Sequence, residues 1–514
     1  MHGCGVQLRV GIRAPTCQHE LVSTRFETAQ PLTSPRPWQL PAGARLVIVF
    51  EFCERVGFYS MVSLLALFLS AERAGGGFGW KGAPALTLLG VFSGLMYALP
   101  VAGGYVADRF LGHRRALTFG GTLMLGAYLL LTVAVFLGGA VPLQVPLGRW
   151  SLPSDLPAAA GGAYQTVSAA FWVAICALIL GNSLVKSTLV VALGDTFVGD
   201  DGRRETAYAY YYAGINLGGL IAGLAAGSVA AAWGWGPAFG VSAVAMGLAL
   251  AAYLLFGRRY LKPRPPSRAG QSQHTPSAAT EARLQLAVDH DAVATRVRLF
   301  ILAVFAVLLL VYETGSFQLW GTMSLFLERS VNRHAGPFEI PTQWFTSIES
   351  AGLIVAAPAF AALWAWLGRR GREPDIVIKY ALALVLGAVG LLLFSLSAWP
   401  YTGGAKPGWT LPALGIWVQA TGEVAAWTAS YGLVYRLAPP RVVAAVMGAF
   451  YAGTLGLGGY LAGWLGTFAE KLGQDRFFLV LGLATAGVAG IALAIRPGLR
   501  TLATARGLEL DAHA

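Results

Sequence analysis

Charged residues are scarce in this sequence. Only 12% of its 514 residues are charged, whereas soluble proteins usually carry about 25%. Hydrophobic residues make up 56% of the chain, so too little polar surface remains to cover a water-soluble globule. The composition excludes an ordinary soluble domain and indicates a protein whose solvent is lipid.

Cysteine is also rare, and the reactive groupings of enzymes are missing. The four cysteines, at positions 4, 17, 53 and 176, show neither the spacing of a metal site nor that of a disulfide framework. No compact Ser/His/Asp grouping is found that could serve as a catalytic centre. We therefore expect no enzyme and no cofactor. Residues 1–40 lack the apolar core of a secretory signal peptide.

Long apolar runs dominate the rest of the chain. A membrane-spanning helix needs about 20 mostly apolar residues, and about twelve such runs occur in two sets of six. The first set covers 45–71, 86–107, 114–138, 169–193, 208–231 and 236–257. The second set covers 297–327, 342–367, 376–398, 411–437, 443–469 and 476–496. The sequence predicts an all-α integral membrane protein with two six-helix halves, 45–257 and 297–496.

Basic residues predict how the chain crosses the membrane. Arginines follow the second, fourth, eighth and tenth predicted helices, and the segment between the halves, 258–296, begins with basic residues and prolines. Because basic loops stay on the cytoplasmic side, we expect a cytoplasmic linker at 258–296 and cytoplasmic tails at 1–44 and 497–514. The protein would lie in the cell inner (plasma) membrane. Orientation in the bilayer, rather than nucleic-acid binding, then explains the net charge of +12.

Seven charged side chains fall inside the predicted helices, where each one is unfavourable by about 2.5–3.5 kcal/mol or more. They are Glu51, Glu54, Arg55, Lys186, Glu313, Glu349 and Glu423. Glu51 and Glu54 share one helix face, and Arg55 can pair with Glu51 one turn away. Five acids against two bases leave surplus carboxylates, which can bind and release protons as a proton-coupled carrier requires. Structural pairing between helices remains the alternative.

Several motifs occur in order along the chain. They are EFCERVGFY at 51–59, GGYVADRFLGHRR at 103–115, GNSLVK at 181–186, YYAGINLG at 211–218, and GE at 422–423 followed by MG at 447–448. Together they resemble the proton-dependent oligopeptide transporter (POT/PTR) family of the major facilitator superfamily. The resemblance covers most of 45–470. It implies a major facilitator fold and proton-coupled import of di- or tripeptides, or of peptide-like compounds, by alternating access.

The resemblance also implies roles for individual residues and partners. The expected partners are a small substrate such as a short peptide, protons and the lipid bilayer, and the expected state is a monomer driven by the proton gradient alone. Proton coupling is expected at Glu51, Glu54, Arg55 and Glu313. Substrate binding is expected at Tyr59, Tyr97, Lys186, Asn216, Glu349, Glu423 and Phe450. Lys186 is also expected to pair with the charged residues at 51–55. A conformational role in the loop after the second helix is expected for Asp108, Arg109 and Arg114.

Several positions depart from the family pattern, and three of them bear on the substrate. Val62 stands where the family often has a second arginine, Glu349 where it usually has an asparagine, and Phe450 where a tryptophan is common. The gain of a carboxylate and the loss of an arginine predict a more negative cavity and a more positive substrate than a plain dipeptide. Since a fold does not fix a substrate, a major facilitator carrier of nitrate, an amino acid, an amine or a drug remains an alternative. A non-transporting membrane receptor is a remote one.

Overall fold

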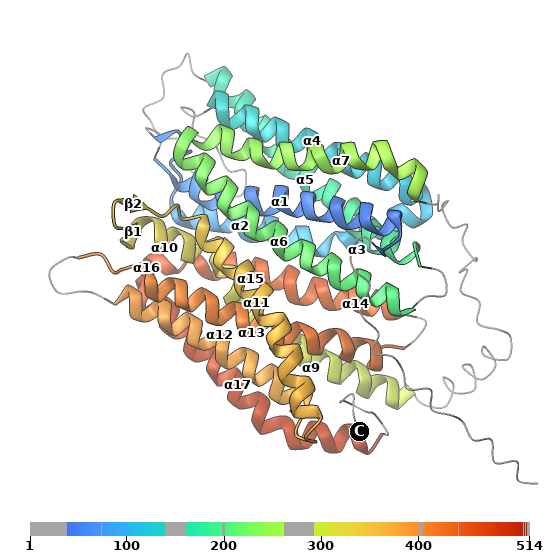
Figure 1. Ribbon diagram of the computed structural model, residues 1–514. Helices are drawn as coiled ribbons and strands as arrows, with labels where there is room; N and C mark the ends of the chain where they lie inside the picture. Colours follow the sequence, from blue (N-terminus) through green and yellow to red (C-terminus); the bar gives the residue numbers. More distant parts are fainter. Residues whose placement is uncertain are drawn as a thin grey trace, which may run out of the picture.

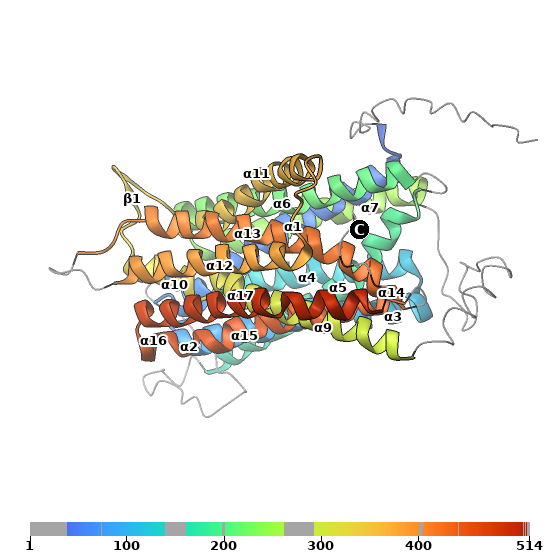
Figure 2. The ribbon, with the colours of Figure 1, turned by 90° about the horizontal axis from the view of Figure 1, so that it is seen from below.

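The computed structural model describes residues 39–72, 75–138, 161–197, 201–261, 292–399, 405–439, 442–506, 508 and 510. Most of the predicted tail 1–44 and of the predicted linker 258–296 lies outside the described residues. Long helices run side by side, and a two-stranded hairpin projects from one end of the bundle (Figure 1). We call this end the hairpin end. The opposite end, where α1 begins and α17 finishes, is called the termini end (Figure 2).

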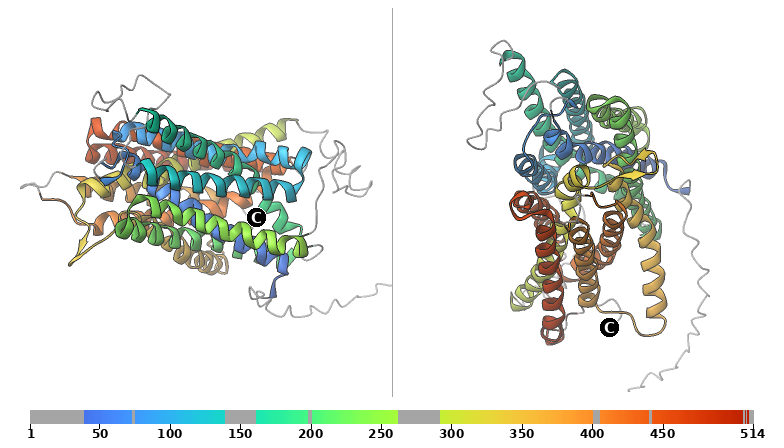
Figure 3. Two further views of the ribbon diagram at one scale, coloured as in Figure 1. Left: turned by 90° about the horizontal axis from the view of Figure 1, so that it is seen from above. Right: turned by 90° about the vertical axis from the view of Figure 1, so that its left-hand side faces the viewer.

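Two groups of helices lie next to each other, each with its own apolar core (Figure 1; Figure 3, right). The first group consists of α1 (Ala42–Ser70), α2 (Gly82–Ala98), α3 (Pro100–Val106), the π-helical turn Ala107–Leu111, α4 (His113–Gly138), α5 (Gly161–Gly194), α6 (Asp201–Trp233) and α7 (Trp235–Tyr260). Its core is built by aromatic and aliphatic side chains such as Phe50, Phe68 and Phe171. We call this group the N-half.

The second group, which we call the C-half, follows after the segment 262–291. It consists of α9 (Ala292–Ser316), the 3-10 turn Phe317–Trp320, α10 (Thr322–Ser330), the strands β1 (His334–Ala335) and β2 (Phe338–Glu339), α11 (Trp344–Gly368), α12 (Ile376–Ala398), α13 (Thr410–Leu437), α14 (Val443–Tyr451), the π-helical turn Ala452–Gly456, α15 (Leu457–Gly466), α16 (Ala469–Leu472) and α17 (Gln474–Thr504). The two strands pair antiparallel, with His334 opposite Glu339.

The helices are long and apolar enough to cross a bilayer. Within the described residues, ten helices pass this test, and eleven do if the bent pair α2 and α3 counts as one span. The 28-residue helix α13 is not among them, because Glu423 and several other polar residues lie within it. With α13 included, the arrangement agrees with the predicted all-α membrane protein of about twelve spans.

Three of the predicted spans are interrupted. The run 86–107 bends by 40° between α2 and α3, where Pro100 lacks the N–H that would continue the helical ladder. The run 297–327 passes through a 3-10 turn and breaks at Gly321 before α10. The run 443–469 contains a π-helical turn at 452–456. Apolar periodicity extends across such breaks, so the sequence pattern alone predicted continuous helices.

The predicted boundaries of the halves also need correction. Helix α1 begins at residue 42, α7 continues to residue 260, and α9 already begins at residue 292. Helix α17 runs through Pro497 to residue 504, so the predicted tail 497–514 begins in helical form. The helix tolerates this proline near its end, where Arg496 and Arg500 approach Asp375 with N–O distances of 2.6 and 3.6 Å.

Asp375 is expected to be a strong stabilising residue at the termini end. It is buried, its carboxylate accepts the N–H of Ile378 at the start of α12, and it holds Arg496 of α17. Replacing it by alanine should lower the free energy of unfolding by about 1–3 kcal/mol, since a helix cap and a buried acceptor are lost together. Chemical unfolding in mixed micelles measures this. The exposed Glu470→Ala variant should lose less than about 1 kcal/mol, and an equal loss in both variants would contradict the assignment.

The two halves meet closely at the hairpin end. A Cβ atom added to Gly90 of α2 would lie 2.9 Å from the Cα of Gly463 on α15, so these two helices touch through their backbones. Helix α6 of the N-half and helix α11 of the C-half also meet towards the hairpin end, where Ser347 donates a hydrogen bond to the carbonyl of Leu220 at 2.8 Å. Trp344 adds another to the carbonyl of Leu224 at 3.2 Å. The halves are therefore closed against each other at the hairpin end.

Candidate functional site

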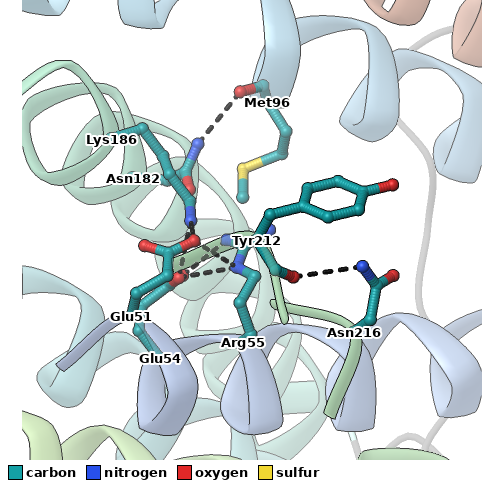
Figure 4. A network of polar contacts seen from close by, with 8 residues as sticks. All are labelled: Glu51, Glu54, Arg55, Met96, Asn182, Lys186, Tyr212 and Asn216. Atoms are coloured by element: carbon teal, nitrogen blue, oxygen red, sulfur yellow. Dashed lines mark hydrogen bonds and ion pairs between the residues drawn. The ribbon is translucent and has the colours of Figure 1, made fainter. Parts of the chain in front are cut away.

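A buried cluster of four charged side chains joins α1 to α5 (Figure 4). The Arg55 guanidinium donates two hydrogen bonds of 2.7 Å to Glu54, and its Nε lies 3.5 Å from a Glu51 oxygen. Lys186 donates to Glu51 and lies 3.0 Å from Glu54. Glu51 and Glu54 are both fully buried. Two acids and two bases therefore form a compact cluster with no net charge, which we call the N-half cluster.

The positions of these side chains follow from helix geometry. Glu51, Glu54 and Arg55 lie within about one turn of α1, so all three can face α5, where Lys186 approaches them from the opposite side. One turn before Lys186, Asn182 donates a hydrogen bond of 2.9 Å to the carbonyl of Met96 on α2. Asn182 was not predicted as a site residue, although it belongs to the GNSLVK motif. Its bond ties α5 to α2 beside the cluster.

Aromatic residues connect the N-half cluster to the C-half. The Arg55 guanidinium lies 4.4 Å from the ring centroid of Phe58 and 5.4 Å from that of Tyr59. Tyr59 packs edge-on against Trp320 of the C-half at 5.7 Å, and Tyr97 packs in the same way on Phe317 at 5.6 Å. Tyr59 and Tyr97 therefore stand at the boundary between the halves, and their substrate-binding role stays a prediction.

Three carboxylates gather on the C-half side of this boundary. Glu313 of α9 is buried and accepts the indole N–H of Trp427 at 2.9 Å. Glu349 of α11 is half-buried and accepts the hydroxyl of Ser316 at 3.4 Å. Glu423 of α13 is also half-buried and lies one turn before Trp427, the residue that donates to Glu313. We call these three residues the C-half carboxylates.

Within the described residues, the charges of the C-half carboxylates are not balanced. Among the described residues, no lysine or arginine nitrogen lies within salt-bridge distance of any of them. The described ion pairs of the C-half lie instead at its two ends, as in the pairs Arg329–Glu470 and Lys379–Glu373. The surplus of buried acids predicted from the sequence is thus located entirely in the C-half.

An aromatic face beside Glu423 was missed by the sequence analysis. Trp427 follows Glu423 by one turn of α13, and Tyr431 follows by another. Ring centroids of Trp427 lie 5.6 Å from Tyr431 and 5.1 Å from Tyr451 of α14, and the two tyrosine hydroxyls are hydrogen-bonded to each other. The four-residue spacing from Glu423 could have indicated this face, but apolar helices contain many aromatic residues at such spacings.

Two predicted substrate-binding residues make other contacts. The side chain of Asn216 donates a hydrogen bond of 3.1 Å to the carbonyl of Tyr212 on its own helix (Figure 4). Phe450 is buried among the apolar side chains of the C-half core. Neither residue contributes a polar atom to the N-half cluster or to the C-half carboxylates in this conformation.

The predicted loop residues lie apart from both groups. Asp108 sits in the π-helical turn that follows α3, and one of its oxygens lies 2.9 Å from Nε2 of His113. The Arg109 guanidinium lies about 6 Å from the rings of Tyr105 and Phe110. Arg114 lines a cavity of about 360 Å³ between the ends of α1, α4, α5 and α7. All three residues are at the termini end, where the loop was expected.

The described part of the chain holds no group of three or more His, Cys, Asp or Glu side chains arranged to bind a metal. What it does hold is a neutral, buried network of ions facing unbalanced carboxylates across the boundary between two helical halves. Such an arrangement can exchange protons and bind a small zwitterion, because both processes need buried groups of opposite charge that change partners.

The fold is that of known transporters. A peptide transporter POT in complex with alafosfalin superposes with a TM-score of 0.75, covering 91% of this chain and 97% of the other at 21% identity. A POT family transporter in complex with 5-aminolevulinic acid gives a TM-score of 0.73, with 89% and 97% coverage and 19% identity. This likeness confirms the predicted major facilitator fold.

Sequence comparisons agree with the structural ones. The dipeptide and tripeptide permease A of Citrobacter koseri is 25% identical over 508 residues, which span 90% of this chain and 93% of the relative. The peptide transporter YePEPT of Yersinia enterocolitica is 25% identical over 469 residues, with 81% and 85% coverage. The uncharacterized transporter YclF of Bacillus subtilis is 22% identical over 504 residues, with 90% and 94% coverage.

A family model covers most of the chain as well. The POT family model matches residues 122–275 and 279–478, which include Lys186, Glu313, Glu349 and Glu423, although the motif at 51–59 lies before the matched range. The resemblance seen in the sequence motifs is thereby confirmed, and this chain belongs to the POT family of multi-pass membrane transporters.

Proposed function

We propose that this protein is a proton-coupled symporter that imports di- or tripeptides, or peptide-like compounds, by alternating access. The observation that carries the proposal is the N-half cluster, which pairs Arg55 and Lys186 with two buried glutamates and faces the C-half carboxylates. A zwitterionic peptide has one carboxylate and one ammonium group. Its carboxylate would compete for Lys186, and its ammonium group would bind Glu423.

Proton coupling follows from this competition. When the substrate carboxylate takes Lys186 away from Glu51 and Glu54, a buried acid is left without its counter-ion, and binding a proton stabilises it. We propose that Glu51, Glu54 and Arg55 couple the proton to the substrate in this way. Glu313, which is buried and bonded to Trp427, would lie on the proton route. The proton gradient would be the only source of energy.

The distribution of basic residues supports an orientation in the inner membrane. Basic side chains such as Arg114, Arg203, Arg258 and Arg369 lie at or near the termini end, whereas the hairpin end has fewer. Since basic residues concentrate on the cytoplasmic side, the termini end would face the cytoplasm. The closed hairpin end would then face outward, and the structure would represent a state closed to the outside. Because one chain would contain the whole pathway, we propose a monomer.

Uptake of labelled dialanine by proteoliposomes tests this function. An inward proton gradient should raise the initial rate at least about tenfold over liposomes without a gradient, because coupling links both fluxes. A protonophore should abolish the increase. If dialanine neither enters the liposomes nor shifts the melting temperature of folded protein, while other solutes do, the proposal is wrong and the cargo is a different small solute.

A further inference from the structure

The distribution of buried charge differs between the two halves. In the N-half cluster, two acids are paired with two bases. The N–O distances are 2.7–3.5 Å in the pairs Arg55–Glu54, Arg55–Glu51 and Lys186–Glu54. The C-half carboxylates meet no lysine or arginine among the described residues. Buried anions require compensation, so protons or positively charged groups from outside the protein must supply it.

The three C-half carboxylates are not equally available for a ligand. Glu313 is 2% exposed and already accepts the indole N–H of Trp427. Glu349 and Glu423 are both half-buried and come from different helices. Glu349 accepts the hydroxyl of Ser316 on α9, and Trp427, one turn after Glu423, donates to Glu313, which lies one turn before Ser316. These two carboxylates therefore face one small region from two sides.

This region lies on the substrate side of the boundary between the halves. The Tyr59 ring lies 5.4 Å from the Arg55 guanidinium and packs against Trp320 of the C-half at 5.7 Å. The aromatic face of Trp427 and Tyr431 continues from Glu423 along α13, and aromatic rings attract cations as well as apolar groups. Acidic and aromatic groups thus surround the same part of the proposed path.

We propose that Glu349 determines substrate charge: together with Glu423 it selects peptides or peptide-like amines that carry a second positive group. This inference rests on the proposed function and deepens it. A zwitterionic dipeptide has a single ammonium group, which can balance only one of the two carboxylates. A second ammonium or guanidinium group within the same molecule balances the other, so binding no longer leaves a buried anion uncompensated.

Glu349 could instead carry an additional proton, and the two roles predict different results. A proton carrier changes how uptake depends on the proton gradient, equally for all substrates. A ligand-binding carboxylate changes the ratio between substrates of different charge at a fixed gradient. Charge discrimination is therefore the decisive measurement.

The experiment compares three dipeptides that differ in the charge of one side chain. Lysyl-alanine, glutaminyl-alanine and glutamyl-alanine compete with labelled dialanine for uptake by proteoliposomes that contain the full chain. Lysyl-alanine should inhibit at a concentration at least about tenfold lower than glutaminyl-alanine, as expected for one additional buried charge interaction. Glutamyl-alanine should inhibit least.

The Glu349→Gln variant should abolish the preference for lysyl-alanine over glutaminyl-alanine. Glu470→Gln removes an exposed carboxylate at the hairpin end and should keep the wild-type ratio within about threefold. If Glu349→Gln does not fold, Glu349→Asn serves in its place, and the wild-type comparison is a test by itself.

Equal inhibition by lysyl- and glutaminyl-alanine, or an unchanged ratio in the Glu349 variant, overturns the inference although peptides are transported. If no peptide of any charge competes or shifts the melting temperature, the proposed function itself has failed.

Discussion

Replacing Glu54 by glutamine should abolish gradient-driven uptake of dialanine, with a loss of at least about 100-fold in initial rate. Glu54 accepts both hydrogen bonds of the Arg55 fork and lies 3.0 Å from Lys186. Glutamine has nearly the same shape, but it cannot bind a proton or balance either base. One positive charge would then remain buried without a counter-ion, and no proton could follow the substrate.

A double variant separates coupling from stability. Glu54→Gln alone should lower the melting temperature, because breaking a buried ion pair leaves an uncompensated charge, which lowers the free energy of unfolding by about 3–5 kcal/mol. Adding Lys186→Gln removes one base as well, so the remaining pair, Glu51 and Arg55, is neutral again. We expect the double variant to regain much of the stability but no uptake. Wild-type uptake in Glu54→Gln, with Glu470→Gln as the matched control, would contradict the coupling role.

The N-half cluster could largely be predicted from the sequence because its geometry is local. Glu51, Glu54 and Arg55 lie within five residues of one helix, so helical periodicity alone places them together. Only the contact with Lys186 spans a long sequence distance, and the family resemblance supplied it. The Arg55 guanidinium nevertheless forms its two 2.7 Å bonds with the adjacent Glu54, whereas helical spacing favoured Glu51.

The C-half site could be predicted only as a set of residues, not as an arrangement. Glu313, Glu349 and Glu423 lie on three different helices, and no periodicity fixes how these helices are rotated towards one another. The bond from Trp427 to Glu313 and the bond from Ser316 to Glu349 depend on that rotation. Interruptions such as the break at Gly321 could not be predicted from periodicity either, because tertiary packing decides where an apolar run bends.

Closure at the hairpin end depends on two glycines that the sequence analysis did not single out. Helices α2 and α15 touch at Gly90 and Gly463. A Cβ atom on Gly463 would lie 2.5 Å from the carbonyl oxygen of Leu86 and would also clash with the backbone of Gly90. All of these neighbours are backbone atoms, so no side-chain rotation can relieve the overlap.

Gly463→Leu should therefore hold the two halves apart at the hairpin end and block transport. Alternating access needs closure at each end in turn, so both gradient-driven uptake and substrate exchange should fall by at least about 100-fold, provided that the lost closed state was favoured by about 3 kcal/mol or more. The matched control is Gly487→Leu on α17, where an added Cβ would meet no atom within 4 Å.

Spin labels report whether the block has the proposed cause. Lys81 precedes α2 and Lys471 lies in α16, so labels on cysteines at these positions, in a background without the native cysteines, follow the distance between the halves at the hairpin end. In Gly463→Leu the distance distribution should shift to longer values, whereas Gly487→Leu should retain the wild-type distribution and wild-type uptake. Lost uptake with an unchanged distance would mean that the leucine disrupts the local packing of α15 without preventing closure. Normal uptake would show that contact between α2 and α15 is dispensable, and closure at this end would then depend on other contacts, such as the hydrogen bonds between α6 and α11.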